Sequence, residues 1–347
     1  MSCVLIDPKD PLQLDFVVEQ LRRSRPIGLP TETVYGLAGL ASDEKALARI
    51  FELKARPHFD PLIVHVLGES QITPWIAEGE STALHQKLMK AFWPGPLTLL
   101  FRKSLKVPDL CTAGTEWVAI RSPAHPVFRQ ILERLQGHAL AAPSANRFAS
   151  ISPTSARDVV AELGPYGLEA VVQGGPSQHG LESTVVKVIS QTELEILRPG
   201  SVSLEALMQV VGPGVHVKLR ASGSGVEETA GHEAPGQHRL HYAPSKPLHY
   251  VAADKLDAFL RERGLSRAAG ALLEVFPSTP LIAQGWSEQE CLSPRSDWSE
   301  AASRLFATLR ALDSNSRVEF IVALECSPES LGLAISDRLR RASAKTR

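Results

Sequence analysis

The stretch IGLPTETVYGL, residues 27–37, decides the fold of this 347-residue chain. It opens on the short apolar run Ile27–Leu29, which predicts a buried strand, and a proline and three polar residues follow at once. Before it, a helix is predicted over Leu12–Arg23, with apolar residues along one side. Behind it, a second helix is predicted to begin after Ser42 as the N-cap and to end before Pro57. Strands and helices in this order indicate a sheet with helices packed on it.

Short apolar runs separated by Pro and Gly predict further strands along the first two thirds of the chain. They are Leu62–Leu67, Leu97–Phe101, Trp117–Ile120, Ala139–Ala142, Ala170–Gln173, Thr184–Ile189 and Leu194–Leu197. Ser155 with Asp158 resembles a capping box and predicts one more helix. The pattern favours an α/β fold around a twisted mixed sheet.

The amino-acid composition changes between Gly212 and Gln237, where Gly-Pro-Gly and Ala-Ser-Gly-Ser-Gly stand among few large apolar residues. Such a composition is typical of a flexible linker. After it, predicted strands and helices alternate, which indicates a small parallel sheet. We therefore predict a domain over residues 1–211, a linker over 212–244 and a second domain over 245–347.

Composition excludes several classes of protein. The formal net charge is −1, so the chain lacks the overall basic character of a dedicated nucleic-acid binder. Its four cysteines form no C-x-x-C pair, which argues against a zinc knuckle or a disulfide framework. No apolar run is long enough to span a bilayer, and residues 1–10 carry no signal peptide. A soluble protein of the cytoplasm, with no membrane partner, is expected.

Polar residues at the ends of predicted strands and helices are the candidates for a binding site. Strand ends tend to meet at one edge of a sheet, and Lys or Arg placed there suits phosphate and carboxylate oxygens. The candidates are Lys54, Arg56, Arg121, Ser144, Asn146 and Arg198, together with His65 inside the apolar run Leu62–Leu67. Taken singly, each also has a structural explanation, such as a solvated charge at a helix end or a turn contact. No phosphate-binding loop, dinucleotide fingerprint, G-x-S-x-G or H-E-x-x-H motif is present.

Eight segments, in their order and spacing, closely resemble the YrdC-like domain of threonylcarbamoyl-AMP synthases. They are PTETVYGL (30–37), KARP (54–57), PLIVH (61–65), WPGPLT (93–98), VAIRSPAHP (118–126), APSAN (142–146), ESTVV (182–186) and LRPG (197–200). Further along, Ala234–Gly236, His241–Pro244 and Gly332–Ile335 resemble the linker and the C-terminal domain of the two-domain, Sua-type members. The resemblance covers nearly the whole chain.

The resemblance implies a fold and a reaction. The fold is an α/β YrdC-like domain with a large concave cleft, a linker over the active site and a smaller Rossmann-like domain. The reaction joins L-threonine, bicarbonate or CO2 and ATP into L-threonylcarbamoyl-adenylate and releases pyrophosphate. Mg²⁺ is expected to be bound mainly through ATP, with no protein ligand assigned. The product would pass to tRNA threonylcarbamoyl-transferase proteins that modify tRNA beside the anticodon.

The resemblance also assigns residues. Lys54 and Arg56 would be catalytic and would bind ATP, together with Asp60, Ser144, Asn146, Ser152, Arg198, Arg239 and Tyr242. The threonine pocket would contain Thr31, His65, Arg121, Ala142 and Ser183, with Arg121 as partner of the carboxylate. The segment Gln237–Leu240 departs from the Met-Lys-Tyr or similar run of many relatives.

Three other functions stay open at this point. A double-stranded RNA or ribosome-assembly factor would use a concave basic surface, and weak RNA binding is compatible with the sequence. A carbamoyl transferase of the hydrogenase-maturation type would carry zinc-finger cysteine pairs, which this sequence lacks. A regulator that binds threonine or nucleotide without turnover would need no full set of cations.

Overall fold

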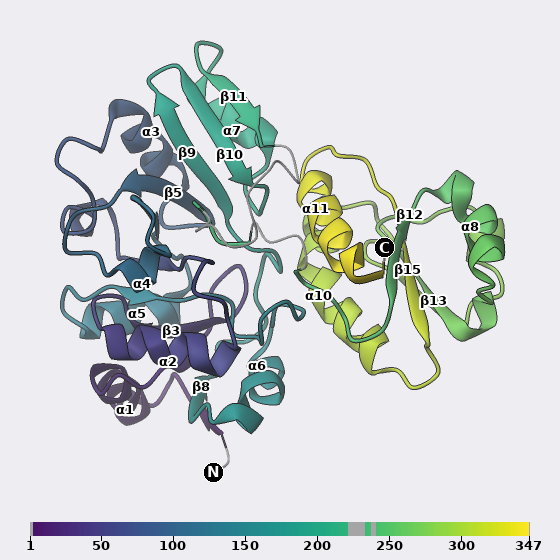
Figure 1. The fold of residues 1–347 in the computed structure, drawn as a ribbon, viewed down its shortest axis with the longest axis horizontal. Helices are drawn as coiled ribbons and strands as arrows, with labels where there is room; N and C mark the ends of the chain where they lie inside the picture. The colour runs from purple at the N-terminus through teal and green to yellow at the C-terminus, as the bar shows by residue number, and fades with distance from the viewer. Residues whose placement is uncertain (1–2, 221–232, 237–240, 347) are drawn as a thin grey trace. The chain divides into compact units, whose positions relative to one another are not determined.

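A computed structural model of the chain describes residues 3–220, 233–236 and 241–346. The chain forms two compact units, each with its own sheet (Figure 1). The first comprises Met1–Phe148, Ser152–Gln178 and Glu182–His238. The second comprises Ala149–Ile151, His179–Leu181 and Arg239–Arg347.

The first unit is built on an 11-stranded sheet in the order β1-β8-β2-β3-β7-β4-β6-β5-β9-β10-β11. Its strands are β1 (Val4–Ile6), β2 (Ile27–Leu29), β3 (Gly36–Leu40), β4 (Ile63–His65), β5 (Leu97–Arg102), β6 (Trp117–Arg121), β7 (Leu140–Ala141), β8 (Ala170–Val172), β9 (Thr184–Ser190), β10 (Glu193–Arg198) and β11 (His216–Leu219). Its helices are α1 (Pro11–Arg22), α2 (Glu44–Lys54), α3 (Ala83–Phe92), α4 (Asp109–Thr112), α5 (Pro126–Arg134), α6 (Ala156–Leu163) and α7 (Leu204–Val211). The sheet contains both parallel and antiparallel strand pairs, so the predicted mixed sheet is confirmed.

Several helices of the first unit begin at side-chain caps that the sequence supplies. The carboxylate of Asp10 accepts a hydrogen bond from Leu12 N at the start of α1. The capping box predicted from Ser155 and Asp158 opens α6. Helix α2 differs from the prediction by one residue, because Asp43 and not Ser42 is its N-cap. The Asp43 carboxylate reaches two backbone N–H groups of the first turn, which a residue one position earlier does not.

The central strands separate two apolar layers because successive side chains point to opposite faces of a sheet. Val64 of β4 and Ile120 of β6 pack in the larger core cluster on one face. Ile63 of β4 and Ala119 of β6, each one residue earlier, pack in a smaller cluster on the other face. This smaller cluster adjoins the polar residues described below.

Strand β11 lies inside the stretch that the sequence suggests as a linker. It pairs in parallel with β10, from Glu193 opposite His216 onward, and so extends the sheet at its edge (Figure 1). Ion pairs reinforce the addition, since Lys218 Nζ lies 2.6 Å from Glu193 Oε1 and Arg220 binds Glu195. The glycines and the proline before β11 suggest a linker, but the free edge of β10 is a template for one more strand.

The second unit contains a four-stranded, all-parallel sheet in the order β12-β15-β13-β14. Its strands are β12 (Leu248–Val251), β13 (Gly270–Glu274), β14 (Glu288–Cys291) and β15 (Phe320–Leu324). Its helices are α8 (Leu256–Arg263), α9 (Pro280–Ala283), α10 (Trp298–Ser314) and α11 (Gly332–Ala342), with α8 on one side of the sheet and α10 and α11 on the other (Figure 1). The predicted small parallel sheet is confirmed. In the described parts of both units, no helix combines the length and apolar character needed to cross a membrane.

Candidate active site

Five strands place one residue each in a row across the first sheet. His65 of β4 pairs with Arg121 of β6, and Arg121 pairs with Thr98 of β5. Thr98 pairs with Val185 of β9, and Val185 pairs with Arg198 of β10. Paired residues of neighbouring strands point to the same face, so the side chains of this row share one face at one edge. The structure thus brings together three candidates that follow one another only distantly in the sequence.

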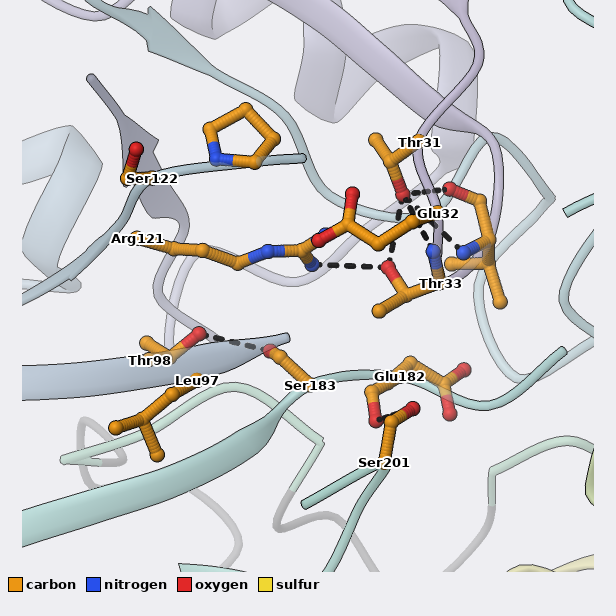
Figure 2. A network of polar contacts seen from close by, with 12 residues as sticks. Thr31, Glu32, Thr33, Leu97, Thr98, Arg121, Ser122, Glu182, Ser183 and Ser201 are labelled. Atoms are coloured by element: carbon orange, nitrogen blue, oxygen red, sulfur yellow. Dashed lines mark hydrogen bonds and ion pairs between the residues drawn. The ribbon is translucent and has the colours of Figure 1, made fainter. Parts of the chain in front are cut away.

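The guanidinium of Arg121 is held by the polar turn that follows β2 (Figure 2). Its Nη1 donates to Thr33 Oγ1 at 2.9 Å, and its Nη2 lies 2.7 Å from Glu32 Oε1. The hydroxyl of Thr31 donates to Val34 O at 2.6 Å and accepts from Thr33 N, so it closes the turn. The PTET motif therefore holds an arginine side chain in one orientation.

The imidazole of His65 lies beside Arg121 and is buried. Its Nδ1 lies 2.9 Å from Ile63 O, and because a carbonyl oxygen accepts, Nδ1 carries the proton. Burial, helped by the charge of Arg121, lowers the pKa of His65 to about 3. The ring is therefore neutral at physiological pH and adds no second cation next to Arg121.

Arg198 and Ser183 form the other end of the row. Arg198 Nη2 donates to Ser183 O at 3.0 Å and to Ser183 Oγ at 3.1 Å. The hydroxyls of Ser183 and Thr98 are hydrogen-bonded to one another at 2.7 Å (Figure 2). Gly200 allows this arrangement, because a Cβ there would stand 2.4 Å from Glu182 O.

Lys54 is the last residue of α2 and is almost completely buried. Its Nζ donates to Ser144 O at 2.5 Å and to Asn146 O at 2.6 Å. Burial first, and the nearby charge of Arg56 second, hold the pKa of Lys54 well below its usual value. An ammonium in such surroundings gains more from an added anion than it would in water.

Arg56 follows Ala55, whose φ of 47° reverses the chain at the end of α2. Its guanidinium donates from Nε to Asp60 O at 3.0 Å and from Nη2 to Pro61 O at 2.8 Å. The carboxylate of Asp60 pairs with the same Nη2 at 3.0 Å and is fully buried. Asp60 thus fixes Arg56, and its predicted contact with ATP stays a prediction.

A short segment of the linker, Glu233–Gly236, rests on the same face of the sheet. Glu233 forms ion pairs with Lys187 at 2.7 Å and with Arg220 at 2.9 Å. Ala234 is fully buried in the smaller core cluster, beside the row. Pro235 O accepts from Arg198 Nη1 at 3.3 Å, and Gly236 N donates to the carboxylate of Asp60 at 3.3 Å. The segment therefore touches two of the candidate site residues.

The remaining candidates have the following places. Ser152 Oγ donates to Glu182 Oε1 at 2.6 Å, and Asn146 Nδ2 donates to Arg147 O at 2.7 Å. Ala142 directly follows β7 and is buried. Tyr242 belongs to the second unit, where its ring stacks on Phe306. Arg239 lies outside the described residues.

Comparison with known proteins shows the family to which the chain belongs. A model of a family described as "Telomere recombination" matches residues 19–200, and a model described as "Threonylcarbamoyl-AMP synthase, C-terminal domain" matches residues 202–344. A threonylcarbamoyl-AMP synthase of Pyrococcus abyssi is 36% identical over 327 residues, which are 93% of this chain and 92% of that protein. The chain belongs to the threonylcarbamoyl-AMP synthase family. It is accordingly an enzyme, with an activity of the nucleotidyltransferase type.

Other relatives extend the family likeness to both units. A threonylcarbamoyl-AMP synthase of Bacillus subtilis is 33% identical over 97% of this chain and 94% of its own. The crystal structure of Sua5 from P. abyssi complexed with L-threonine superposes with a TM-score of 0.84 at 32% identity, covering 99% of this chain and 98% of that one. The predicted fold class, with its two α/β units, is confirmed by this match.

Sequence reasoning missed four polar groups that the structure places among these family motifs. Glu32 and Thr33 lie inside the quoted PTET motif, and Thr98 interrupts the apolar run of β5; both facts were visible signals. Nothing in the sequence pointed to Glu233, which is recognised only by its two cationic partners. Across residues 3–220, 233–236 and 241–346, no group of three or more His, Cys, Asp or Glu side chains could hold a metal ion.

Proposed function

We propose that this chain makes L-threonylcarbamoyl-adenylate from L-threonine, bicarbonate or CO2 and ATP, with release of pyrophosphate. The observation that carries the proposal is a set of four buried cations. Arg121 and Arg198 lie in one row of the first sheet, and Lys54 and Arg56 lie at the end of α2. Buried cations are costly unless anions meet them, and this reaction brings three anionic groups together. Two synthases of the family cover nearly the whole chain, and a solved relative is complexed with L-threonine.

The chemistry needs positioning and charge neutralisation more than a covalent intermediate. The amino group of threonine captures CO2 to give a carbamate, with loss of a proton. A carbamate oxygen then forms a bond to the α-phosphorus of ATP, and the bond from that phosphorus to the pyrophosphate oxygen breaks. Cations fixed before the reaction stabilise the negative charge that builds up on the phosphate oxygens.

Within this proposal, Arg121 binds the threonine carboxylate. The hydrogen bond from Nη1 to Thr33 and the ion pair with Glu32 hold its guanidinium ready for a planar, two-oxygen partner. Thr31, His65, Ala142 and Ser183 would complete the pocket. His65 suits it as a neutral ring, since a pKa of about 3 leaves its other nitrogen able to accept a hydrogen bond.

The nucleotide would lie on the side of Lys54, Arg56 and Arg198. Ser144, Asn146 and Ser152 would contribute hydroxyl and amide groups, and Asp60, Arg239 and Tyr242 remain proposed ATP contacts as well. ATP would enter as its Mg²⁺ complex, with the cation held mainly by phosphate oxygens. The ion would add to the positive charge at the phosphates, while the chain's own cations orient them.

The product would serve tRNA modification. An adenylate of threonylcarbamate is an activated acyl donor, and we propose that tRNA threonylcarbamoyl-transferase proteins pass its acyl group to the adenosine beside the anticodon. Weak RNA binding by this chain itself is compatible with that role.

Pyrophosphate release from MgATP, measured with and without L-threonine and bicarbonate, tests the proposal. We expect release that depends on both compounds, together with threonylcarbamoyl-adenylate in the mass spectrum. Arg121→Ala should raise the threonine KM, whereas ATP binding should persist. Absence of release from a folded sample that binds ATP would refute the synthase reaction and favour a regulator, and a steep salt dependence of RNA affinity would then point to RNA binding.

A further inference from the structure

Two charged groups in the first unit are buried with hydrogen-bonding capacity unused. The side chains of Glu32 and Arg121 are 3% and 4% exposed, and a single contact of 2.7 Å joins Glu32 Oε1 to Arg121 Nη2. Among the residues that the structure describes, neither Glu32 Oε2 nor Arg121 Nε has a hydrogen-bond partner. Buried polar atoms nearly always have partners, and charged ones need them most. An unmet acceptor beside an unmet donor therefore indicates a ligand.

The neighbouring side chains do not meet either need. The hydroxyl of Thr31 already donates to Val34 O, and the hydroxyl of Thr33 accepts from Arg121 Nη1. His65, the partner of Arg121 in the sheet, points its Nδ1 at Ile63 O. Glu32 Oε2 and Arg121 Nε therefore keep unused hydrogen-bonding capacity within the described residues. Figure 2 shows the two side chains lying against one another.

The spacing of the two charges selects the kind of ligand. In an α-amino acid, one carbon atom separates the cationic nitrogen from the carboxylate. Glu32 and Arg121 are likewise adjacent, joined by the 2.7 Å contact. The ammonium group of an amino acid could therefore lie against Glu32 while its carboxylate lies against Arg121. A ligand with a carboxylate alone would satisfy Arg121 and leave Glu32 Oε2 unpartnered.

We propose that Glu32 binds the amino nitrogen of the amino-acid substrate while Arg121 binds its carboxylate. This deepens the proposed function and rests on it for the identity of the amino acid. The pair recognises an α-amino acid as a zwitterion, and Glu32 goes on to accept the single N–H that the carbamate retains. The same contact orients the nitrogen before CO2 is added and the carbamate after it.

The test compares L-threonine with 3-hydroxybutanoate of the same configuration at the hydroxyl carbon, which is threonine without its amino group. Binding to the full chain is measured by calorimetry. For the wild type we expect threonine to bind about 10–100-fold more tightly, the range of a hydrogen bond between charged groups. For Glu32→Gln we expect the affinity for threonine to fall more than the affinity for 3-hydroxybutanoate, so that the ratio falls toward one.

Controls separate this role from simple support of Arg121. Glu19→Gln, which breaks a surface glutamate–arginine pair, should keep the wild-type ratio. ATP affinity of Glu32→Gln should match the wild type, and Glu32→Asp, with the charge kept on a shorter chain, should recover part of the ratio. A purely structural Glu32 would weaken both acids equally, and that result would overturn the proposal.

Two further outcomes are decisive. If the wild type binds 3-hydroxybutanoate as tightly as threonine, the proposal fails whether or not any variant folds. If the ratio behaves as expected but no threonine-dependent pyrophosphate release is found, recognition by Glu32 stands and the synthase reaction fails.

Discussion

Replacing Gly200 by alanine should displace the backbone of the site. A Cβ at this position would stand 2.4 Å from Glu182 O, 2.5 Å from Ser183 C and 2.5 Å from Thr184 N. All three atoms belong to the main chain, so no side-chain rotation relieves the contact. Either Pro199–Gly200 or Glu182–Thr184 must move.

The size of the effect follows from these contacts. Forcing extra atoms into a packed site costs about 1–3 kcal/mol. For a domain of about 150–250 residues this lowers Tm by about 2–4 °C per kcal/mol. The movement also displaces Ser183, whose carbonyl and hydroxyl oxygens both accept from Arg198. A misplacement of about 1 Å at a reacting centre lowers rates by about 100-fold.

Thermal unfolding and threonine-dependent pyrophosphate release measure the two effects separately. Gly214→Ala is the matched control, because a Cβ at Gly214 meets nothing within 4 Å. We expect Gly200→Ala to lower both Tm and rate, and Gly214→Ala to leave both near the wild type. Equal Tm and equal rate in the two variants would refute the claim that Gly200 is required for the approach of these two segments.

Three further changes have expected outcomes. Lys54→Met removes the ammonium bound to Ser144 O and Asn146 O, and should lower kcat for pyrophosphate release about 100-fold. A wild-type kcat in this variant would contradict the role of Lys54 at the phosphates. Glu233→Gln loses its ion pairs with Lys187 and Arg220, and should raise the KM for ATP several-fold with kcat nearly unchanged. An unchanged KM in steady-state kinetics would show that the linker segment does not assist ATP binding. Folded His65 stays neutral down to its pKa of about 3, whereas His65 in the unfolded chain takes up a proton below about pH 6.5. The free energy of unfolding therefore falls as pH decreases between these values, by at most about 1.4 kcal/mol per pH unit. Denaturant titrations should show a flatter pH dependence for His65→Asn, and parallel curves for the variant and the wild type would be evidence against this linkage.

Local patterns predicted the parts of this fold that depend on near neighbours. The capping box of Ser155 and Asp158 is such a case, since both partners lie in one turn. Apolar runs bounded by Pro and Gly likewise marked β5, β6 and β9 to within two residues. Strand β3 was not predicted, because its run GLAGL carries two glycines and becomes a strand only through pairing with β2 and β7.

The sequence predicted which residues belong to the candidate site better than it predicted how those residues are arranged. Placing Arg121 and Arg198 at strand ends indicated that they would meet, and sheet register brings both into one row with His65. Register depends on contacts between distant segments, so it could not be derived from spacing. The sequence also gave no sign that Lys54 would be satisfied by the backbone carbonyls of Ser144 and Asn146.

The row that runs from His65 to Arg198 has a consequence for how the enzyme matures. Its members come from five strands, and the last of them, Arg198, is synthesised long after the first. Contacts between segments so far apart in sequence form slowly and late in folding. A chain that has left the ribosome only through β7 holds His65 and Arg121 but has no Val185 or Arg198 to pair with. Activity is therefore a property of the finished first unit, and chains that are partly synthesised or partly folded lack a complete site.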